Sequence, residues 1–129
     1  MAKILAADDE EGLLELIRFS LDADGHEVTT AKNGRDALAA ARKARYDLIV
    51  MDVMMPFMDG YHVSAEVSQS KDAPPILLLT SRDFDQDQAA IKGSGATAFL
   101  SKPFEITELL RVIRELIAGR ADPPARSLK

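Results

Sequence analysis

Seven polar side chains that could do chemistry together stand directly after short apolar runs. They are Asp8, Asp9, Glu10, Asp52, Thr80, Ser81 and Lys102. Carboxylates are the ligands that Mg²⁺ prefers, and a carboxylate can also act as a nucleophile that carries a phosphoryl group. A hydroxyl and an ammonium supply the hydrogen bond and the positive charge that phosphoryl oxygens need. This combination of residue types is suited to metal-assisted phosphoryl transfer.

Each of these residues also has an ordinary structural explanation when it is considered alone. The acidic run at residues 8–10 is typical of a helix N-terminus, where acids cap the helix and offset its dipole. Asp52 alone is a loop acid, Thr80 a solvated hydroxyl, and Lys102 a strand-end lysine whose stem covers apolar surface. What favours the chemical interpretation is that acid, acid, hydroxyl and ammonium follow four different apolar runs at the same relative position.

The elements that must position these side chains follow from an alternation of apolar runs and helical periodicity. The expected strands are residues 3–7, 28–31, 48–51, 76–79 and 97–100. The expected helices cover about 13–21, 34–41, 61–69, 83–92 and 106–117. Short apolar strands that alternate with helices predict the α/β class, with a doubly wound, five-stranded parallel sheet and (βα)5 organisation.

Ligands of such sheets bind beyond the carboxyl ends of the strands, which is where the polar residues lie. If strands 3–7 and 48–51 are neighbours, the side chains of Asp8, Asp9 and Asp52 converge. Two carboxylates about 5 Å apart repel each other by roughly 3 kcal/mol at an effective dielectric constant of 20. A hard divalent cation would compensate this repulsion and keep open positions for phosphoryl oxygens.

Length and composition limit the alternatives. The chain has 129 residues and a formal net charge of −5, so that neither direct nucleic-acid binding nor membrane adhesion is expected as its main activity. It contains no cysteine, which excludes thiolate zinc sites and Cys nucleophiles. We expect one domain at residues 1–119 in the cytoplasm. Residues 120–129 carry a Pro pair and no apolar stripe, which predicts a flexible C-terminal tail or linker stub.

From about Lys3 to Gly119 the chain resembles the receiver domain of bacterial two-component response regulators. The motifs that carry the resemblance are LAADDE, MDVMMPFMDG, LLLTS and FLSKPF, in this order along the chain. The resemblance implies a flavodoxin-like fold with strand order 2-1-3-4-5, of the single-domain kind that chemotaxis regulators have. It also implies a phosphoprotein that acts in signal transduction.

The resemblance assigns roles to the acidic residues by their position in the motifs. Asp52 corresponds to the residue that accepts the phosphoryl group as an aspartyl phosphate. Asp9 and Asp52 would bind Mg²⁺ or Mn²⁺ directly, and Asp8 would bind it through water. The backbone carbonyl of Met54 would be the third protein ligand of the metal.

The remaining motif residues correspond to the phosphoryl-binding and switching positions of the family. Thr80 and Lys102 would bind the phosphoryl oxygens, and the Lys102–Pro103 peptide bond would be cis. Thr80 and Phe99 would form the switch, in which Phe99 fills the space that Thr80 leaves. Phe99 lacks the hydroxyl of the Tyr often found there, and a core aromatic in the strand is the alternative interpretation.

As a family member, the chain would take its phosphoryl group from a histidine kinase or a histidine phosphotransfer protein. It would then bind a downstream protein through the surface formed by residues 83–92, 97–100 and 106–117. The helix at 83–92 has few apolar anchors and should be easily repositioned. We expect a monomer or weak dimer, and no enzyme activity other than self-phosphorylation and slow autodephosphorylation.

Two other functions remain open at this point. A Mg²⁺-dependent aspartyl phosphatase acting on small phosphate esters would also use a strand-end aspartate, but it generally needs a second acid at the position that Met54 occupies. A receiver that no longer takes phosphate is disfavoured by the intact acid, hydroxyl and lysine set. His26 and His62 have no companion ligands at zinc spacing and are expected at the surface.

Overall fold

A parallel sheet forms the centre of the computed structural model, which describes residues 1–81 and 88–119. Within these residues the sheet has five strands: β1 (Lys3–Ala7), β2 (Glu27–Ala31), β3 (Leu48–Asp52), β4 (Ile76–Thr80) and β5 (Ala98–Ser101). Their order across the sheet is β2-β1-β3-β4-β5, and every neighbouring pair is parallel. The predicted fold class and strand order are confirmed.

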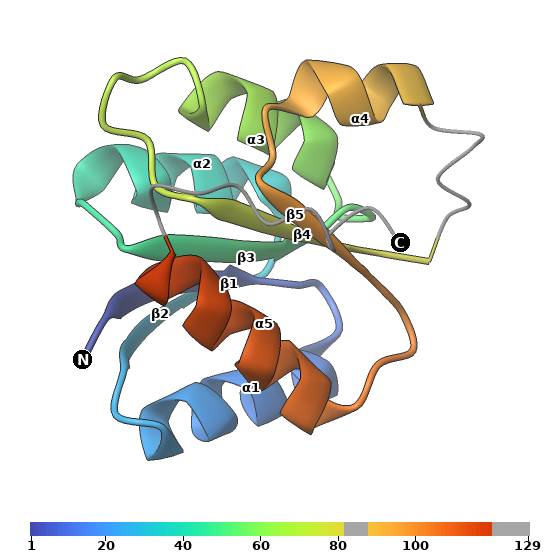
Figure 1. The fold of residues 1–129 in the computed structure, drawn as a ribbon. Coiled ribbons are helices and arrows are strands. Elements are labelled where there is room, and N and C mark those ends of the chain that lie inside the picture. Colours follow the sequence, from blue (N-terminus) through green and yellow to red (C-terminus); the bar gives the residue numbers. More distant parts are fainter. Residues whose placement is uncertain (82–87, 120–129) are drawn as a thin grey trace.

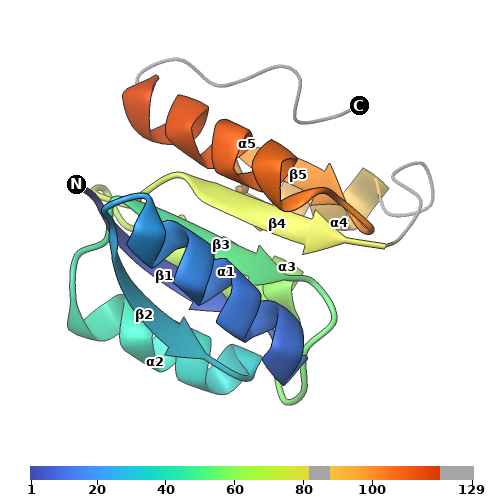
Figure 2. The ribbon, with the colours of Figure 1, turned by 90° about the horizontal axis from the view of Figure 1, so that it is seen from below.

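Helices cover both faces of this sheet. The described residues form α1 (Glu11–Ala23), α2 (Gly34–Lys43), α3 (Gly60–Val67), α4 (Gln88–Ser94) and α5 (Ile106–Ala118). Helices α2, α3 and α4 lie on one face, whereas α1 and α5 lie on the other (Figure 1, Figure 2). None of the helices in the described part of the chain has the length and apolar character needed to cross a membrane.

Two predicted segments extend beyond the described residues. The helix expected at 83–92 is described only from Gln88, and α4 continues to Ser94, two residues past the predicted end. The tail predicted at 120–129 lies outside the described residues altogether.

The apolar runs form strands because both sheet faces are covered. Every residue of β3 and β4 is buried, as expected for continuous apolar runs inside a parallel sheet. Strand β2 is more polar, and it lies at the edge of the sheet. Alternate residues of the strands point to opposite faces of the sheet and belong to two separate cores, one beneath α1 and α5 and one beneath α2 and α3.

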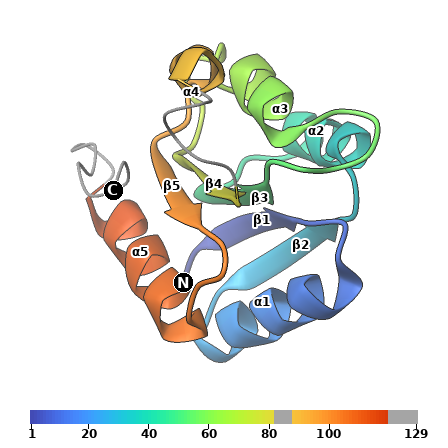
Figure 3. The same ribbon diagram turned by 90° about the vertical axis from the view of Figure 1, so that its right-hand side faces the viewer.

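The strand register brings the polar strand ends to one edge of the sheet. Ala7 pairs with Met51, so the next residues, Asp8 and Asp52, lie level with each other. Thr80 pairs with Ser101, and Lys102 follows one residue later. Figure 3 views this edge, at which all the strand arrows end.

The loop between β3 and α3 is packed tightly against the N-terminus of α2. The Gly34 N–H donates a hydrogen bond to the carbonyl of Pro56 at 3.2 Å, and the Met58 N–H donates to the same carbonyl at 2.8 Å. Phe57, between Pro56 and Met58, has a φ of +72°, which is rare for a non-glycine residue. A Cβ atom on Gly34 would overlap the Met58 carbonyl. Glycine is therefore required at position 34 by the close approach of two backbones.

This close approach predicts opposite effects for two glycine-to-alanine substitutions. Gly34→Ala should lower the free energy of unfolding by about 1–3 kcal/mol, since overpacking of this size displaces backbone. Gly12→Ala is the control, because Gly12 lies in α1 with no atom within 4 Å of an added Cβ. It should raise the free energy of unfolding by up to about 1 kcal/mol through helix propensity. Urea denaturation measures both, and equal effects would contradict this interpretation of Gly34.

Candidate functional site

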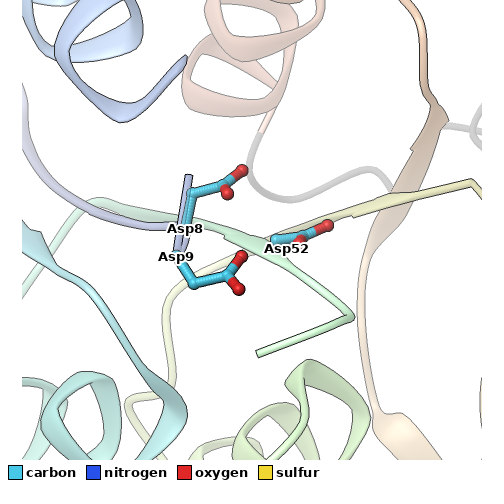
Figure 4. A group of neighbouring side chains, drawn as sticks. All are labelled: Asp8, Asp9 and Asp52. Carbon is cyan, nitrogen blue, oxygen red and sulfur yellow. The ribbon is translucent and has the colours of Figure 1, made fainter. Parts of the chain in front are cut away.

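Three carboxylates meet at the edge of the sheet where β1 and β3 end. One carboxylate oxygen from each of Asp8, Asp9 and Asp52 lies within 4.8 Å of the others (Figure 4). Asp8 is fully buried and Asp52 is 5% exposed, whereas Asp9 is exposed. The convergence predicted from neighbouring strands is therefore present in the structure.

Lys102 is the cation of this site. Its Nζ lies 3.1 Å from Asp8 Oδ2 and 3.2 Å from Asp52 Oδ1, so it bridges the two buried carboxylates. Its backbone N–H donates to the Thr80 carbonyl at 2.8 Å, which ties the residue to the end of β4. The peptide bond between Lys102 and Pro103 is cis.

The electrostatics of the site show that negative charge is in excess. Burial and the charge of Asp8 raise the pKa of Asp52 to about 6, although Lys102 acts in the opposite direction. Burial alone would lower the pKa of Lys102, but the carboxylates of Asp52 and Asp8 outweigh burial and raise it. Among residues 1–81 and 88–119, one ammonium thus faces three carboxylates and does not neutralise them.

This set of donors fits a hard divalent cation. Mg²⁺ prefers oxygen ligands, binds through one or two carboxylates and retains several waters. Burial and, second to it, the charge of Asp8 raise the pKa of Asp52, and a bound cation would favour its ionised form. The exposed Asp9 leaves the site open to solvent, as a hydrated ion requires.

The other predicted site residues lie around this acidic cluster. Thr80 is fully buried at the end of β4, and Ser81 directly after it is exposed. Phe99 is 5% exposed in β5 and packs in the core beneath α2 and α3. The Met54 side chain is 51% exposed on the loop that follows Asp52.

Sequence reasoning missed part of the surroundings of the site. A hollow beside the acidic cluster, called here the Lys102 hollow, has a mainly apolar lining: Glu10, Leu13, Ser81, Lys102, Pro103 and Phe104. Glu10 and Phe104 are the last residues of the motifs LAADDE and FLSKPF, but only the folded structure shows that they line one hollow.

His26 also differs from its predicted surface position. Its side chain is only 11% exposed, and its Nδ1 accepts a hydrogen bond from the Ala2 N–H at 3.1 Å.

With this geometry described, comparison with known proteins identifies the family. The family model for the response regulator receiver domain matches residues 4–114. The chain belongs to this family. Receiver domains are the phosphoacceptor modules of two-component systems, so the predicted family, fold and signalling function are confirmed.

Individual relatives agree with this assignment. The transcriptional regulatory protein PcoR of Escherichia coli is 38% identical over 117 residues, which are 91% of this chain and 52% of that regulator. The chain spans about half the length of the curated relatives it matches.

Solved structures of similar proteins cover nearly the whole chain. The chemotaxis response regulator CheY4 of Vibrio cholerae is 39% identical, with a TM-score of 0.83 over 90% of this chain and 98% of that one. The response regulator TrrA of Thermotoga maritima, solved in complex with Mg²⁺ and BeF, is 32% identical. Its TM-score is 0.79 over 90% of this chain and 99% of that one. None of these relatives favours the phosphatase alternative.

The raised pKa of Asp52 predicts a pH dependence of stability in metal-free buffer. Between its usual pKa of 3.8 and the folded value of about 6, the folded state binds the proton more tightly than the unfolded state. Stability must therefore fall as pH rises through this range. Relative to Asp52→Asn, the wild type should lose up to about 3 kcal/mol of unfolding free energy between pH 4 and 7. Urea denaturation of both proteins at several pH values measures the difference, and a constant difference would refute the prediction.

Proposed function

We propose that Asp52 accepts a phosphoryl group and that Thr80 and Lys102 bind its oxygens. The observation that carries the proposal is the position of the Lys102 Nζ, 3.2 Å from Asp52 Oδ1 at the open edge of the sheet. A phosphoryl group bound to Asp52 would lie within reach of this ammonium. The buried Thr80 hydroxyl at the end of the neighbouring strand is the nearby donor for a second phosphoryl oxygen.

The chain's own residues would act in a simple sequence. With a pKa of about 6, Asp52 is mostly ionised at neutral pH and can attack phosphorus. A bond forms between its carboxylate oxygen and phosphorus as the bond to the leaving group breaks. Lys102 offsets the charge on the phosphoryl oxygens, which is the main requirement of such a transfer.

The metal in this proposal is Mg²⁺ or Mn²⁺. Asp9, Asp52 and the backbone carbonyl of Met54 would bind it directly, and Asp8 would bind it through water. When bound, the cation supplies additional positive charge for the phosphoryl oxygens. The Met54 side chain has no ligand role in this arrangement and would influence access to Asp52.

The partners in this proposal are other signalling proteins in the cytoplasm. A histidine kinase or histidine phosphotransfer protein would donate the phosphoryl group. A downstream protein would bind the surface of α4, β5 and α5. The chain would have no turnover on a separate substrate and would only phosphorylate itself and lose the group slowly.

The acceptor assignment predicts one phosphorylation site. Incubation with acetyl phosphate and Mg²⁺ should give a single phosphoryl adduct by intact mass, which acid preserves and base removes. Asp52→Asn should give no adduct, and omission of Mg²⁺ should largely prevent it. Asp36→Asn, which removes an exposed carboxylate from α2, is the matched control and should be phosphorylated normally. An adduct on the Asp52→Asn protein would overturn the assignment, and rapid multiple turnover would point to a phosphatase.

The switch assignment predicts that Thr80→Ala separates phosphorylation from its conformational effect. The variant should still be phosphorylated, but the change in hydrogen exchange over residues 88–100 should be largely lost. A hydrogen bond to a charged group contributes about 1.5–3 kcal/mol, enough to shift a two-state equilibrium about tenfold or more. Thr107→Ala, at an exposed threonine of α5, is the control. A wild-type response in Thr80→Ala would refute the role of this hydroxyl.

A further inference from the structure

Helices α3 and α4 lie side by side on one face of the sheet (Figure 1, Figure 3), and a buried hydrogen bond joins them. The Ser64 hydroxyl of α3 donates to the carbonyl of Ser94, the last residue of α4, at 2.7 Å. Both serines are buried. The Ser68 hydroxyl lies 3.5 Å from the same carbonyl but donates to the Ala65 carbonyl at 3.2 Å, so Ser64 is the principal donor. A buried carbonyl that loses its donor is left unsatisfied, so this bond is costly to break.

The backbone around Ser94 is also closely packed. Gly95 has a φ of +70°, and a Cβ atom at this position would overlap the Ser68 side chain. Ser94 Oγ donates to the Ile91 carbonyl at 2.8 Å and accepts from the Ala96 N–H at 3.1 Å. We call this contact between the two helices the α4 joint, and it is formed by Ser64, Ser68, Ser94 and Gly95. The joint fixes the C-terminal end of α4.

The chain on both sides of the α4 joint is tied to the sheet. At the start of α3, the Gly60 N–H donates to the Val53 carbonyl at 2.8 Å, and a Cβ atom on Gly60 would overlap the Asp52 carbonyl. Beyond the joint, the Thr97 N–H donates to the Ile76 carbonyl at 2.9 Å, and Thr97 Oγ1 accepts from the Ile76 N–H at 3.1 Å. The C-terminal end of α4 is therefore held between α3 and the start of β4.

The middle of α4 contacts the part of the core that the proposed switch would change. Ala90 and Ile91 pack against the core that contains Phe99. These two residues precede Ser94 by about 4.5–6 Å along the helix axis. A rearrangement of Phe99 would therefore push α4 at one point while the joint holds it at another. A rigid helix under these conditions turns about the point that is held.

We propose that the α4 joint is a pivot: when Asp52 is phosphorylated, α4 tilts about Ser94 while its C-terminal end keeps its place on α3. Ser64 is the positioning residue that holds the pivot. The inference rests on the proposed function, because phosphorylation of Asp52 supplies the movement. It adds a location to that function. A partner that distinguishes the two states would contact α4 near Ala90, where the displacement is large, and not near Ser94.

The movement can be measured with spin labels, because the chain contains no cysteine and introduced cysteines are its only thiols. Double electron–electron resonance gives the distance between two labels. Ala39→Cys, at an exposed residue of α2, is the common reference and is combined with either Ala89→Cys or Gly93→Cys of α4. Both α4 positions are exposed, and an added Cβ at Gly93 meets no atom within 4 Å. They lie about 7.5 and 1.5 Å from Ser94 along the helix axis.

Distances are compared before and after incubation with acetyl phosphate and Mg²⁺, with the adduct followed by intact mass. The change at residue 89 should exceed the change at residue 93 by at least about twofold, because displacement grows with distance from a pivot. A smaller ratio, or no change at either position in the fully phosphorylated protein, would overturn the pivot and leave the acceptor assignment intact. Failure to form the adduct would overturn the acceptor assignment, and the pivot with it.

The same label pairs test Ser64 itself. In Ser64→Ala the Ser94 carbonyl loses its principal donor, so both ends of α4 should move and the ratio of the two changes should fall to about one. Ser70→Ala is the matched control, because it removes the same hydroxyl from an exposed serine outside the joint and should keep the wild-type ratio. Thermal unfolding shows whether each variant is folded. A wild-type ratio in phosphorylated Ser64→Ala would overturn the role of Ser64, whereas the measurement on the wild-type background tests the pivot without this variant.

Discussion

The repulsion between buried carboxylates at the ends of β1 and β3 is the constraint on which the site depends. Asp8 is fully buried and Asp52 nearly so, and their strands are hydrogen-bonded neighbours in level register. Lys102 bridges both carboxylates at close to 3 Å but supplies only one positive charge. Burying like charges is unfavourable unless they are compensated. The fold therefore holds in place an arrangement that becomes more stable when further positive charge arrives, as the raised pKa of Asp52 indicates.

The apolar packing of the rest of the fold holds the polar strand ends in place. Strands β3 and β4 are buried over their whole length, and two cores fill the space between the sheet and its helices. Such packing fixes the strands rigidly and leaves only their ends free to carry function. The loop after Asp52 is held in the same way, because Gly34 and Met58 allow no space between α2 and the loop. The positive φ of Phe57 within that loop is strain that the surrounding contacts maintain.

The features that could be predicted from the sequence are those that depend on residues close together in the chain. Apolar runs that end at Asp8, Asp52 and Thr80 locate the strands and their functional ends, because a continuous apolar run followed by a polar residue can be recognised in the sequence itself. The features that were missed depend on segments far apart in the chain. The His26 side chain is mostly covered and accepts a hydrogen bond from the Ala2 N–H, and Glu10 and Phe104 line one hollow although they are far apart in the chain. No periodicity within either segment contains that information.

The acidic cluster and Lys102 bring both signs of charge together at one end of the sheet. The three carboxylates favour a bound cation, and Lys102 stands beside Asp52, the proposed acceptor. A phosphoryl group adds about 1.5–2 negative charges. In the proposed function, the Lys102 ammonium, now shared between Asp8 and Asp52, would be drawn toward the phosphoryl group, and the buried Thr80 would follow. Thr80 and Phe99 lie on the adjacent strands β4 and β5, and Phe99 shares a core with Ala90 and Ile91 of α4. A movement of Thr80 toward a phosphoryl group on Asp52 would therefore alter the packing beneath α4.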